Sequence, residues 1–304
     1  MTSYRVLSHQ SSDGPRAGIV VGDTVYDAAL LTARPSCATV LGLLNDWAGT
    51  KPVLEDAVSS AEGKFGKRLR DVKILPPILY PSAIYCAGAN YSDHVANMAR
   101  IQNIPNEPDP HELGLKPWHF LKAPRCVVAT GDEVELTCEK LDWEAELGCV
   151  IGTQARNVPL EKALDYVAFY TIGNDLSARD LTARPHIAFQ SPFKYDWIGQ
   201  KVFDGACPMG PWLVPAGEIA DPQLLAIKLW VNGVLKQDSN TSKMIFTAAE
   251  QIAHLSSRIT LYPGDVVLTG TPSGVGAERG EFLKRGDQVK ITIEKIGDLE
   301  TKIV

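Results

Sequence analysis

Two glutamates separated by a single residue stand out in the segment LDWEAELGCVIG. In a β-strand successive side chains point to opposite faces, so Glu144 and Glu146 would share one face while Trp143 to Ile151 place apolar residues on the other. Two neighbouring carboxylates repel each other, and burying them unpaired is costly. They would need a cation, a shared proton or a basic partner. The alternative is that both lie on a solvated strand face.

A third carboxylate, Asp175, follows the apolar run VAFYTIG and lies in the segment GNDLSARDL. The end of a strand is where catalytic loops are commonly mounted. Taken alone, an aspartate at this position is more often a turn or cap residue than a ligand. Together with Glu144 and Glu146 it would complete a set of oxygen ligands suited to a hard cation such as Mg²⁺, Mn²⁺ or Ca²⁺, with other positions left for water and substrate.

Three further side chains could act on a substrate beside such an ion. His94 lies in GANYSDHVANM, and a histidine with a pKa near neutrality can serve as a base. Lys201, in WIGQKVFDGACPMGPW, and Arg179 could neutralise a substrate carboxylate or a developing enolate. The alternatives are a structural histidine and ordinary surface cations.

The segment YPGDVVLTGTPSGVG combines a tight turn, a strand and a loop rich in Gly, Thr and Ser. Backbone N–H groups of this loop and the Thr271 hydroxyl could bind an anionic or carbonyl oxygen. The Gly-Lys-Ser/Thr ending of a phosphate-binding loop is missing, so nucleotide binding is not indicated.

The elements that would position these residues fall into two units. In residues 1–75, the segment RAGIVVGDTVYDAALL predicts two strands joined by Gly-Asp, and TVLGLLNDW and VLEDAVSSAEGKFG have helical apolar spacing. The Pro-rich stretch 74–82 marks a boundary. We therefore expect a small N-terminal α/β domain over 1–75 and a catalytic domain over 76–304.

The second unit is predicted to be mainly β. Its two expected helices begin near Pro159, through LEKALDYV, and at Thr247, where Glu250 completes a capping-box pattern. Many short strands indicate an α+β protein with a mixed β-roll or barrel-like core rather than a doubly wound sheet. Residues 97–118 are polar and Pro-rich, and we expect a long loop that acts as a lid. The expected strands are 83–87, 126–128, 133–136, 144–151, 168–173, 225–231, 266–269 and 289–293.

Bulk properties restrict the partners and the compartment. The formal net charge of −6 does not suggest a nucleic-acid or anionic-membrane partner. No apolar stretch is long enough to span a membrane, and the beginning of the sequence lacks the apolar segment of a signal peptide. The six cysteines form no CxxC pair and are typical of buried thiols in a reducing compartment. We therefore expect a cytoplasmic protein.

Eight ordered segments together resemble the fumarylacetoacetate hydrolase superfamily, in particular its acylpyruvase-like branch. The resemblance implies a mixed β-roll core, a homodimer, and Mg²⁺ or Mn²⁺ bound by Glu144, Glu146 and Asp175. It implies His94 as the base, Lys201 and Thr271 as further catalytic residues, and Arg179, Tyr91 and Gly270 as substrate contacts. The segments are GPRAGIVVGDTVYD, YCAGANYSDH, FLKAP, LDWEAELGCVIG, YTIGNDLSARD, GQKVFDGACPMGPWLV, NGVLKQDSNTSKMIF and LYPGDVVLTGTPSGVG.

The sequence departs from this branch in the lid and beside the histidine. Relatives carry a glutamate three residues after the histidine, and here that position is Asn97, which cannot supply the charge that strengthens a base. Glu107 or Glu112 from the lid could replace it, His94 could act alone, or the reaction could need no activated water. The lid also carries the extra segment DPHELGLK, and Thr182 stands where relatives often carry Gln. Residues 111, 112, 118 and 119 could line a distal pocket for an unusual substrate.

Three functions remain open from the sequence. The first is a hydrolase that cleaves a C–C bond of a 2,4-dioxo acid, an acylpyruvate or related β-diketone, in aromatic-compound catabolism. The second uses the same metal-assisted enolate chemistry without hydrolysis, as a decarboxylase, isomerase, dehydratase or lyase of a 2-oxo acid. The third is a binding protein that has lost the chemistry. If the first holds, replacing Asn97 with Glu is expected to raise hydrolytic turnover.

Overall fold

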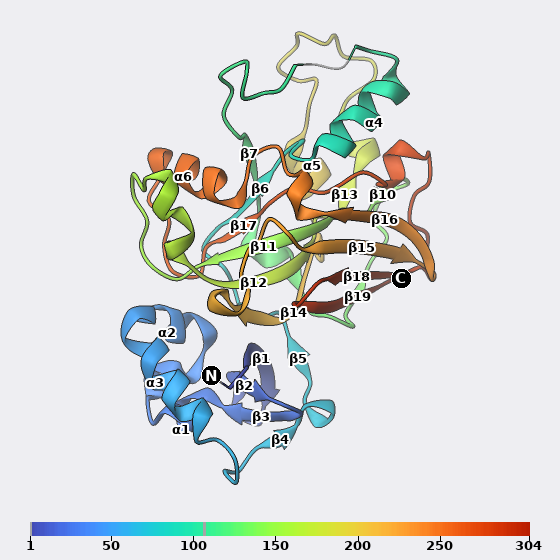
Figure 1. The fold of residues 1–304 in the computed structure, drawn as a ribbon. Helices are drawn as coiled ribbons and strands as arrows, with labels where there is room; N and C mark the ends of the chain where they lie inside the picture. Colours follow the sequence, from blue (N-terminus) through green and yellow to red (C-terminus); the bar gives the residue numbers. More distant parts are fainter. Residues whose placement is uncertain (1, 106–107) are drawn as a thin grey trace.

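The computed structural model describes residues 2–105 and 108–304, and it has the predicted mainly β, α+β architecture. Figure 1 shows a small N-terminal unit below a larger body whose strands are flanked by helices. Loops from two distant parts of the chain extend above the body, at the side opposite to the N-terminal unit.

A long mixed sheet runs through both parts of the molecule in the order β4-β3-β2-β1-β14-β12-β11-β17-β6-β7. Most neighbours are antiparallel, whereas β17 and β6 are parallel. Within the described residues this sheet is open, so the core is a roll rather than a closed barrel. The bounds are β1 (Arg5–Ser11), β2 (Gly14–Val21), β3 (Thr24–Asp27), β4 (Lys67–Arg68), β5 (Ile74–Leu75), β6 (Ile84–Ala87), β7 (His119–Lys122), β8 (Val127–Val128), β11 (Ala145–Ile151), β12 (Val167–Asn174), β14 (Cys207–Pro215) and β17 (Val266–Leu268).

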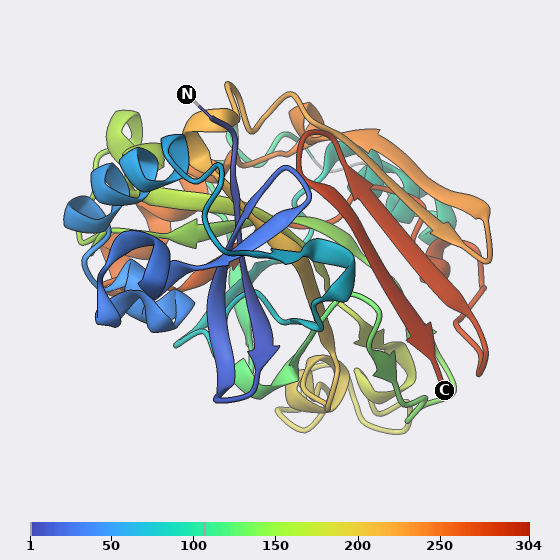
Figure 2. The same cartoon turned by 90° about the horizontal axis from the view of Figure 1, so that it is seen from below.

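A second sheet has five strands in the order β16-β15-β18-β19-β9 and lies beside the long sheet, as Figure 2 shows from below. Its first hairpin turns at Asn232-Gly233, where both residues have positive φ, as this kind of tight turn requires. Strands β10 (Leu141–Asp142) and β13 (Ser177–Ala178) form a separate pair. The five strands are β9 (Glu133–Val134), β15 (Ala226–Val231), β16 (Val234–Asn240), β18 (Gln288–Ile293) and β19 (Gly297–Ile303).

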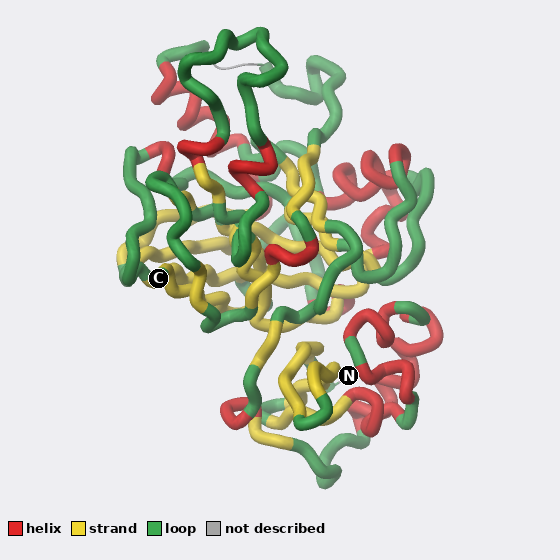
Figure 3. The backbone as a smooth tube through the Cα atoms, turned by 180° about the vertical axis from the view of Figure 1, so that it is seen from behind, coloured by secondary structure: helices red, strands yellow, loops and turns green. Residues whose placement is uncertain are grey.

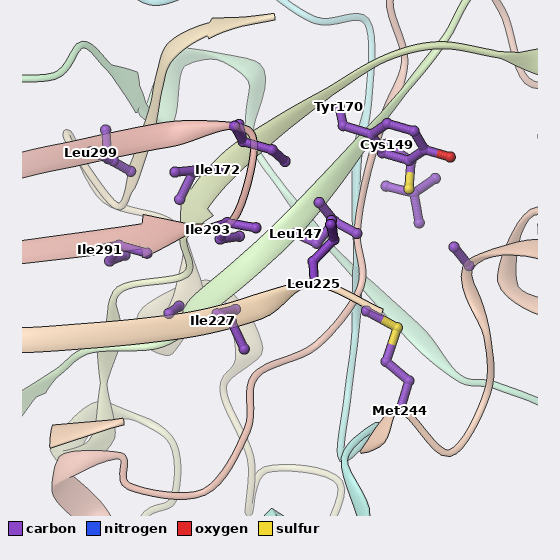
Figure 4. Packing of buried hydrophobic residues seen from close by; sticks show 14 of the residues in the cluster. Leu147, Cys149, Tyr170, Ile172, Leu225, Ile227, Met244, Ile291, Ile293 and Leu299 are labelled. Atoms are coloured by element: carbon purple, nitrogen blue, oxygen red, sulfur yellow. The ribbon is translucent and has the colours of Figure 1, made fainter. Parts of the chain in front are cut away.

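The main apolar core lies between these two sheets. Figure 4 shows Leu147 and Ile172 of the long sheet packed toward Ile227, Ile293 and Leu299 of the five-stranded sheet. The alternation predicted for the segment around the glutamates is confirmed, because residues 143, 145, 147, 149 and 151 all belong to this core, whereas Val150 belongs to a second apolar cluster.

The N-terminal unit contains the predicted hairpin, β2 and β3, and the two predicted helices. It joins the long sheet where Val6 of β1 pairs with Leu213 of β14, and Trp47 packs against Phe169 with ring centroids 4.7 Å apart. Its apolar cluster therefore continues into the larger body. The division near residue 75 stays a prediction. The helices of this unit are α1 (Ala28–Thr32), α2 (Val40–Leu44) and α3 (Trp47–Ser59).

The helices of the larger body lie at its outside, as Figure 3 shows in red. The predicted helix α6 (Ala248–Arg258) is confirmed, and Thr247 and Glu250 form the capping box. The helix predicted after Pro159 is a 3₁₀ helix, Leu160–Tyr166, and β12 begins directly after it. None of the helices in the described part of the chain has the length and apolar character to cross a membrane.

One prediction about the lid is wrong. Residues 97–102 are not loop but belong to helix α4 (Ser92–Gln102), which ends in a left-handed Asn103. Ala99 is the one buried residue that the helix shows. A helix with so small a buried face has a weak apolar pattern, so the sequence gives little indication of α4. His94 and Asn97 consequently lie three residues apart on one helix face. A further short helix, α5 (Trp197–Lys201), presents Lys201 at its last position.

Candidate metal centre and active site

The pairing of β11 with β12 brings the three carboxylates together. These strands are antiparallel, with Ala145 opposite Asn174 and Glu146 opposite Gly173. One step further, the Asp175 N–H donates to the Glu144 carbonyl at 2.9 Å, so Asp175 lies opposite Glu144 and on the same face as both glutamates. A Cβ atom on Gly173 would come within 2.6 Å of the Leu268 side chain, so a glycine is required opposite Glu146.

The three carboxylates form a buried cluster. Each of Glu144, Glu146 and Asp175 offers an oxygen within 4.8 Å of the others. Their exposed fractions are 6%, 1% and 0%, so the alternative of a solvated strand face is wrong. Three carboxylates buried this close together require compensating positive charge.

Two basic residues provide part of that charge. Lys201 Nζ donates to Glu144 Oε2 at 2.9 Å and to Asp175 Oδ2 at 2.7 Å. Arg179 donates to Glu144 and, at 2.9 Å, to Asp142. Asp142 is itself held by the N–H groups of Gly276 and Ala277. Lys201 and Arg179 thus lie at the carboxylates, and both pair with protein acids. Their predicted action on a substrate stays a prediction.

The two glutamates differ in charge balance. Burial disfavours the ionised form of Glu144, but Lys201 and Arg179 outweigh burial and hold the pKa of this carboxyl well below its usual range. Burial raises the pKa of Glu146 well above its usual range, and the negative charges of Asp175 and Glu144 raise it further. Lys201 and Arg179 therefore compensate the negative charge of Glu144, whereas Glu146 has no basic residue of its own among these two.

The donor set fits a hard divalent cation. All three groups are carboxylates, which is the ligand chemistry of Mg²⁺ and Mn²⁺. Asp175 Oδ1 is buried and accepts no hydrogen bond within the described chain. Lys122 Nζ lies 2.8 Å from this oxygen but donates instead to the carbonyls of Leu176 and Lys201, at 3.0 and 2.8 Å. Lys122 therefore compensates part of the charge of Asp175, and Glu146 is the carboxylate that a bound ion would satisfy.

His94 pairs with an acid that the sequence did not indicate. Its Nδ1 lies 2.5 Å from Glu278 Oε1. Because a carboxylate only accepts hydrogen bonds, we assign the proton to Nδ1, and the neutral ring then presents the lone pair of Nε2. This arrangement, a histidine oriented by a buried carboxylate, is the one that strengthens an imidazole base.

Glu278 is held in place by the loop that precedes it and by α4. Its Oε2 accepts hydrogen bonds from Asn97 at 2.5 Å, from Ser273 Oγ at 2.9 Å and from the Gly274 N–H at 2.7 Å. Burial raises the pKa of Glu278, but the hydrogen bonds from His94 and Gly274 outweigh it and hold the pKa below its usual range. Asn97 thus contacts the acid and orients the imidazole only through it.

Two lid residues were predicted as replacements for the missing acid, and the structure describes only one of them. Glu112 is exposed on the lid, and Glu107 lies outside the described residues. The carboxylate comes from the opposite end of the chain, at Glu278.

The loop 269–278 links the histidine to the carboxylates. The Gly270 N–H donates to Glu146 Oε2 at 2.8 Å, and Gly270 has a φ of +94° that favours glycine. Thr271 Oγ1 accepts a hydrogen bond from Gln237 at 2.9 Å. Four residues after Gly270, Gly274 donates to Glu278. Tyr91, predicted as a substrate contact, is fully buried in the core, and its role stays a prediction.

Three residues of the site were not assigned from the sequence. Glu278 lies in GVGAERGE, where nothing in the spacing distinguishes it from Glu281. Lys122 lies in FLKAP, where nothing in the sequence shows that it is buried. Fully buried lysines are rare, so Lys122 stands out only in the structure. Asp142 precedes the glutamate pair directly and orients Arg179.

The open mixed β-roll carries a buried carboxylate cluster that could hold a divalent cation. The family model for the C-terminal domain of fumarylacetoacetate (FAA) hydrolase matches residues 83–304. The chain belongs to this family.

Relatives and solved structures agree with this assignment. The chain is 41% identical over 247 residues to the oxaloacetate tautomerase YisK of Bacillus subtilis, covering 79% of this chain and 76% of that protein. It is 36% identical to a mitochondrial oxaloacetate tautomerase of Xenopus laevis, covering 99% and 91%. The structure of maleylpyruvate hydrolase from Sphingobium sp. SYK-6, with manganese(II) and pyruvate, superposes with a TM-score of 0.75 at 28% identity, covering 99% and 98%.

Proposed function

We propose that this protein is a divalent-metal-dependent enzyme that interconverts the enol and keto forms of a 2-oxo acid. The observation that carries the proposal is the pairing of His94 with Glu278 on a loop that also contacts the carboxylate cluster. Two relatives at 36% and 41% identity are named oxaloacetate tautomerases, which supports the same reaction type.

In the proposed reaction His94 carries the proton. Its Nε2 removes the proton from the enol hydroxyl or from C3 of the substrate, and the protonated ring then returns a proton to the other position, so that atoms and charge balance. Glu278 stabilises the imidazolium that forms between these steps and fixes the direction of the ring. The ring is partly accessible to a substrate, because its side chain is 17% exposed.

The carboxylate cluster is proposed to hold Mg²⁺ or Mn²⁺ through Glu144, Glu146 and Asp175. A divalent cation bound there would chelate the 2-oxo acid and stabilise negative charge on its oxygen. Lys201 orients Glu144 and Asp175, and its ammonium adds positive charge next to the developing enolate. Arg179 fixes Glu144 from the other side.

The test is the decay of the ultraviolet absorbance of enol-oxaloacetate. Chelator-treated protein, the same protein with Mg²⁺ or Mn²⁺, and the variant His94→Ala would be compared, with Glu281→Gln as a control on an exposed residue of the same loop. We expect metal-dependent acceleration that His94→Ala removes and Glu281→Gln keeps. Acceleration that is independent of both metal and His94 would contradict the proposal.

Hydrolysis of a C–C bond in a 2,4-dioxo acid is the second candidate. It is favoured by the same His94–Glu278 pair, because a histidine oriented by a carboxylate can also activate water. The maleylpyruvate hydrolase shares the fold. An acylpyruvate converted into two acids, identified by mass, would establish this function, and an unchanged carbon skeleton would exclude it for that substrate. The expected homodimer stays a prediction that sedimentation can check.

A further inference from the structure

An aromatic cluster extends from Lys201 to the molecular surface. We call Trp118, Phe120 and Trp197 the aromatic shelf. Trp197 and Lys201 are the first and last residues of α5, and residues four positions apart share a helix face. Lys201 is buried at the carboxylates, whereas Trp197 is 45% exposed. The helix therefore connects the charged centre to an apolar surface.

Phe120 lies in contact with both ends of this helix. Its ring is nearly parallel to that of Trp197, with centroids 5.9 Å apart and planes at 21°, and Lys201 Nζ lies 4.7 Å from its centroid. The ammonium that donates to Glu144 and Asp175 is thus also in cation–π distance of Phe120. The apolar shelf begins directly beside the proposed reaction centre.

Trp118 extends the shelf and is fixed in position. Its ring lies 5.7 Å from Trp197 and 6.1 Å from Phe120, measured between centroids. A Cβ atom on Gly88 would come within 1.9 Å of the Trp118 ring, so the indole packs directly on the Gly88 backbone. Gly88 follows β6 and leads into the segment that carries His94. Trp118 nevertheless remains 47% exposed.

Two half-exposed tryptophans that border a charged centre need an explanation. Packing between β7 and α5 accounts for Phe120, which is largely covered, but leaves a large part of both indoles in water. Figure 1 shows that the segments which lead into these residues, the lid and the loop before α5, extend above the body on the same side. An apolar group of the substrate would cover this surface.

We infer that the aromatic shelf binds the distal part of the substrate and favours 2-oxo acids with a flat apolar group, such as a phenyl ring, over those that lack one. The inference rests on the proposed function, because the 2-oxo acid end must lie at the carboxylate cluster for its far end to reach the shelf.

The test compares ligands that share one head group, in the presence of Mg²⁺, by calorimetry. The ligands are 2-oxo-4-phenylbutanoate, which has the aromatic end, 2-oxobutanoate, which lacks it, and oxalate, which probes the head-group site alone. We expect the wild-type protein to bind the phenyl compound about tenfold more tightly than 2-oxobutanoate, as burial of one ring permits.

The variants separate recognition from packing. Trp118→Ala and Trp197→Ala should reduce the tenfold preference to less than about threefold while oxalate affinity stays within about twofold. Trp118→Phe should retain most of the preference, and Trp230→Ala, a tryptophan on the five-stranded sheet, should retain all of it. No preference in the wild type, or a preference that survives both alanine variants, would overturn the inference, as would an equal loss of oxalate binding. Wild-type protein that binds no oxalate with metal would overturn the proposed function and the inference together.

Discussion

Glu278 accepts a hydrogen bond from His94 Nδ1 at 2.5 Å, although 184 positions separate the two residues in the sequence. The position that carries an acid beside the histidine in the resembling branch is Asn97 here, and Asn97 donates to the same carboxylate. The charged partner of the histidine therefore comes from the loop 269–278 and not from α4.

Replacing Glu278 with Gln is expected to lower kcat on enol-oxaloacetate by roughly 100-fold, since an oriented general base contributes about 10²–10⁴. KM should change little, because Glu278 is proposed to act through His94 and not on the substrate. The rising limb of the pH profile of the remaining activity should shift to lower pH, because the imidazolium loses its counter-charge and the ring is deprotonated more easily. An unchanged kcat with an unchanged profile would show that Glu278 is only structural.

The same residue predicts how stability depends on pH. The pKa of Glu278 in the folded protein lies below its usual range, so its contribution is present above the unfolded pKa and is lost as pH falls through the folded pKa. Urea unfolding at pH 7 and at pH 4 should therefore show a larger loss of stability for the wild type than for Glu278→Gln. Equal losses in both proteins would contradict the assignment of an ionised Glu278.

Asn97→Glu is expected to lower activity, which reverses the expectation from the sequence. The Asn97 amide donates to Glu278 Oε2 at 2.5 Å, and a carboxylate at this place would repel Glu278 and disturb His94. We expect kcat to fall roughly tenfold, because His94 would be less well oriented as a general base. The assay should use both enol-oxaloacetate and an acylpyruvate, and a gain with either substrate would mean that position 97 can take over the role of Glu278.

Lys122→Met tests the support of the metal centre. Lys122 Nζ donates to two buried carbonyls and lies 2.8 Å from Asp175, and both side chains are fully buried. Removing one member of such a pair leaves a buried charge, and the expected loss is about 3–5 kcal/mol in the free energy of unfolding. The control is Lys302→Met, whose exposed pair with Glu133 should be worth about 0–1 kcal/mol. Urea unfolding gives both values, and similar small losses would contradict this role of Lys122.

Local patterns in the sequence predict the fold and the three residues of the buried carboxylate cluster well. The alternation around Glu144 and Glu146 identified the buried strand, and the Thr247–Glu250 pattern identified α6, because both depend on residues close in sequence. The mistakes concern features that depend on distant contacts or weak periodicity. Helix α4 has few buried positions, and the partners of His94 and Asp175 come from segments that only the folded chain brings together.

We propose that His94 moves a proton at C3 of a 2-oxo acid. The substrate would be bound at a metal held by Glu144, Glu146 and Asp175. Hydrogen exchange at C3 tests this proposal most directly. Proton NMR in D₂O would follow deuterium entry at C3 of 2-oxobutanoate, with Mg²⁺, for the wild type, His94→Ala and Glu146→Gln. We predict exchange in the wild type that stops without metal and falls at least about 100-fold in both variants. Exchange that continues in His94→Ala at the wild-type rate would contradict the account.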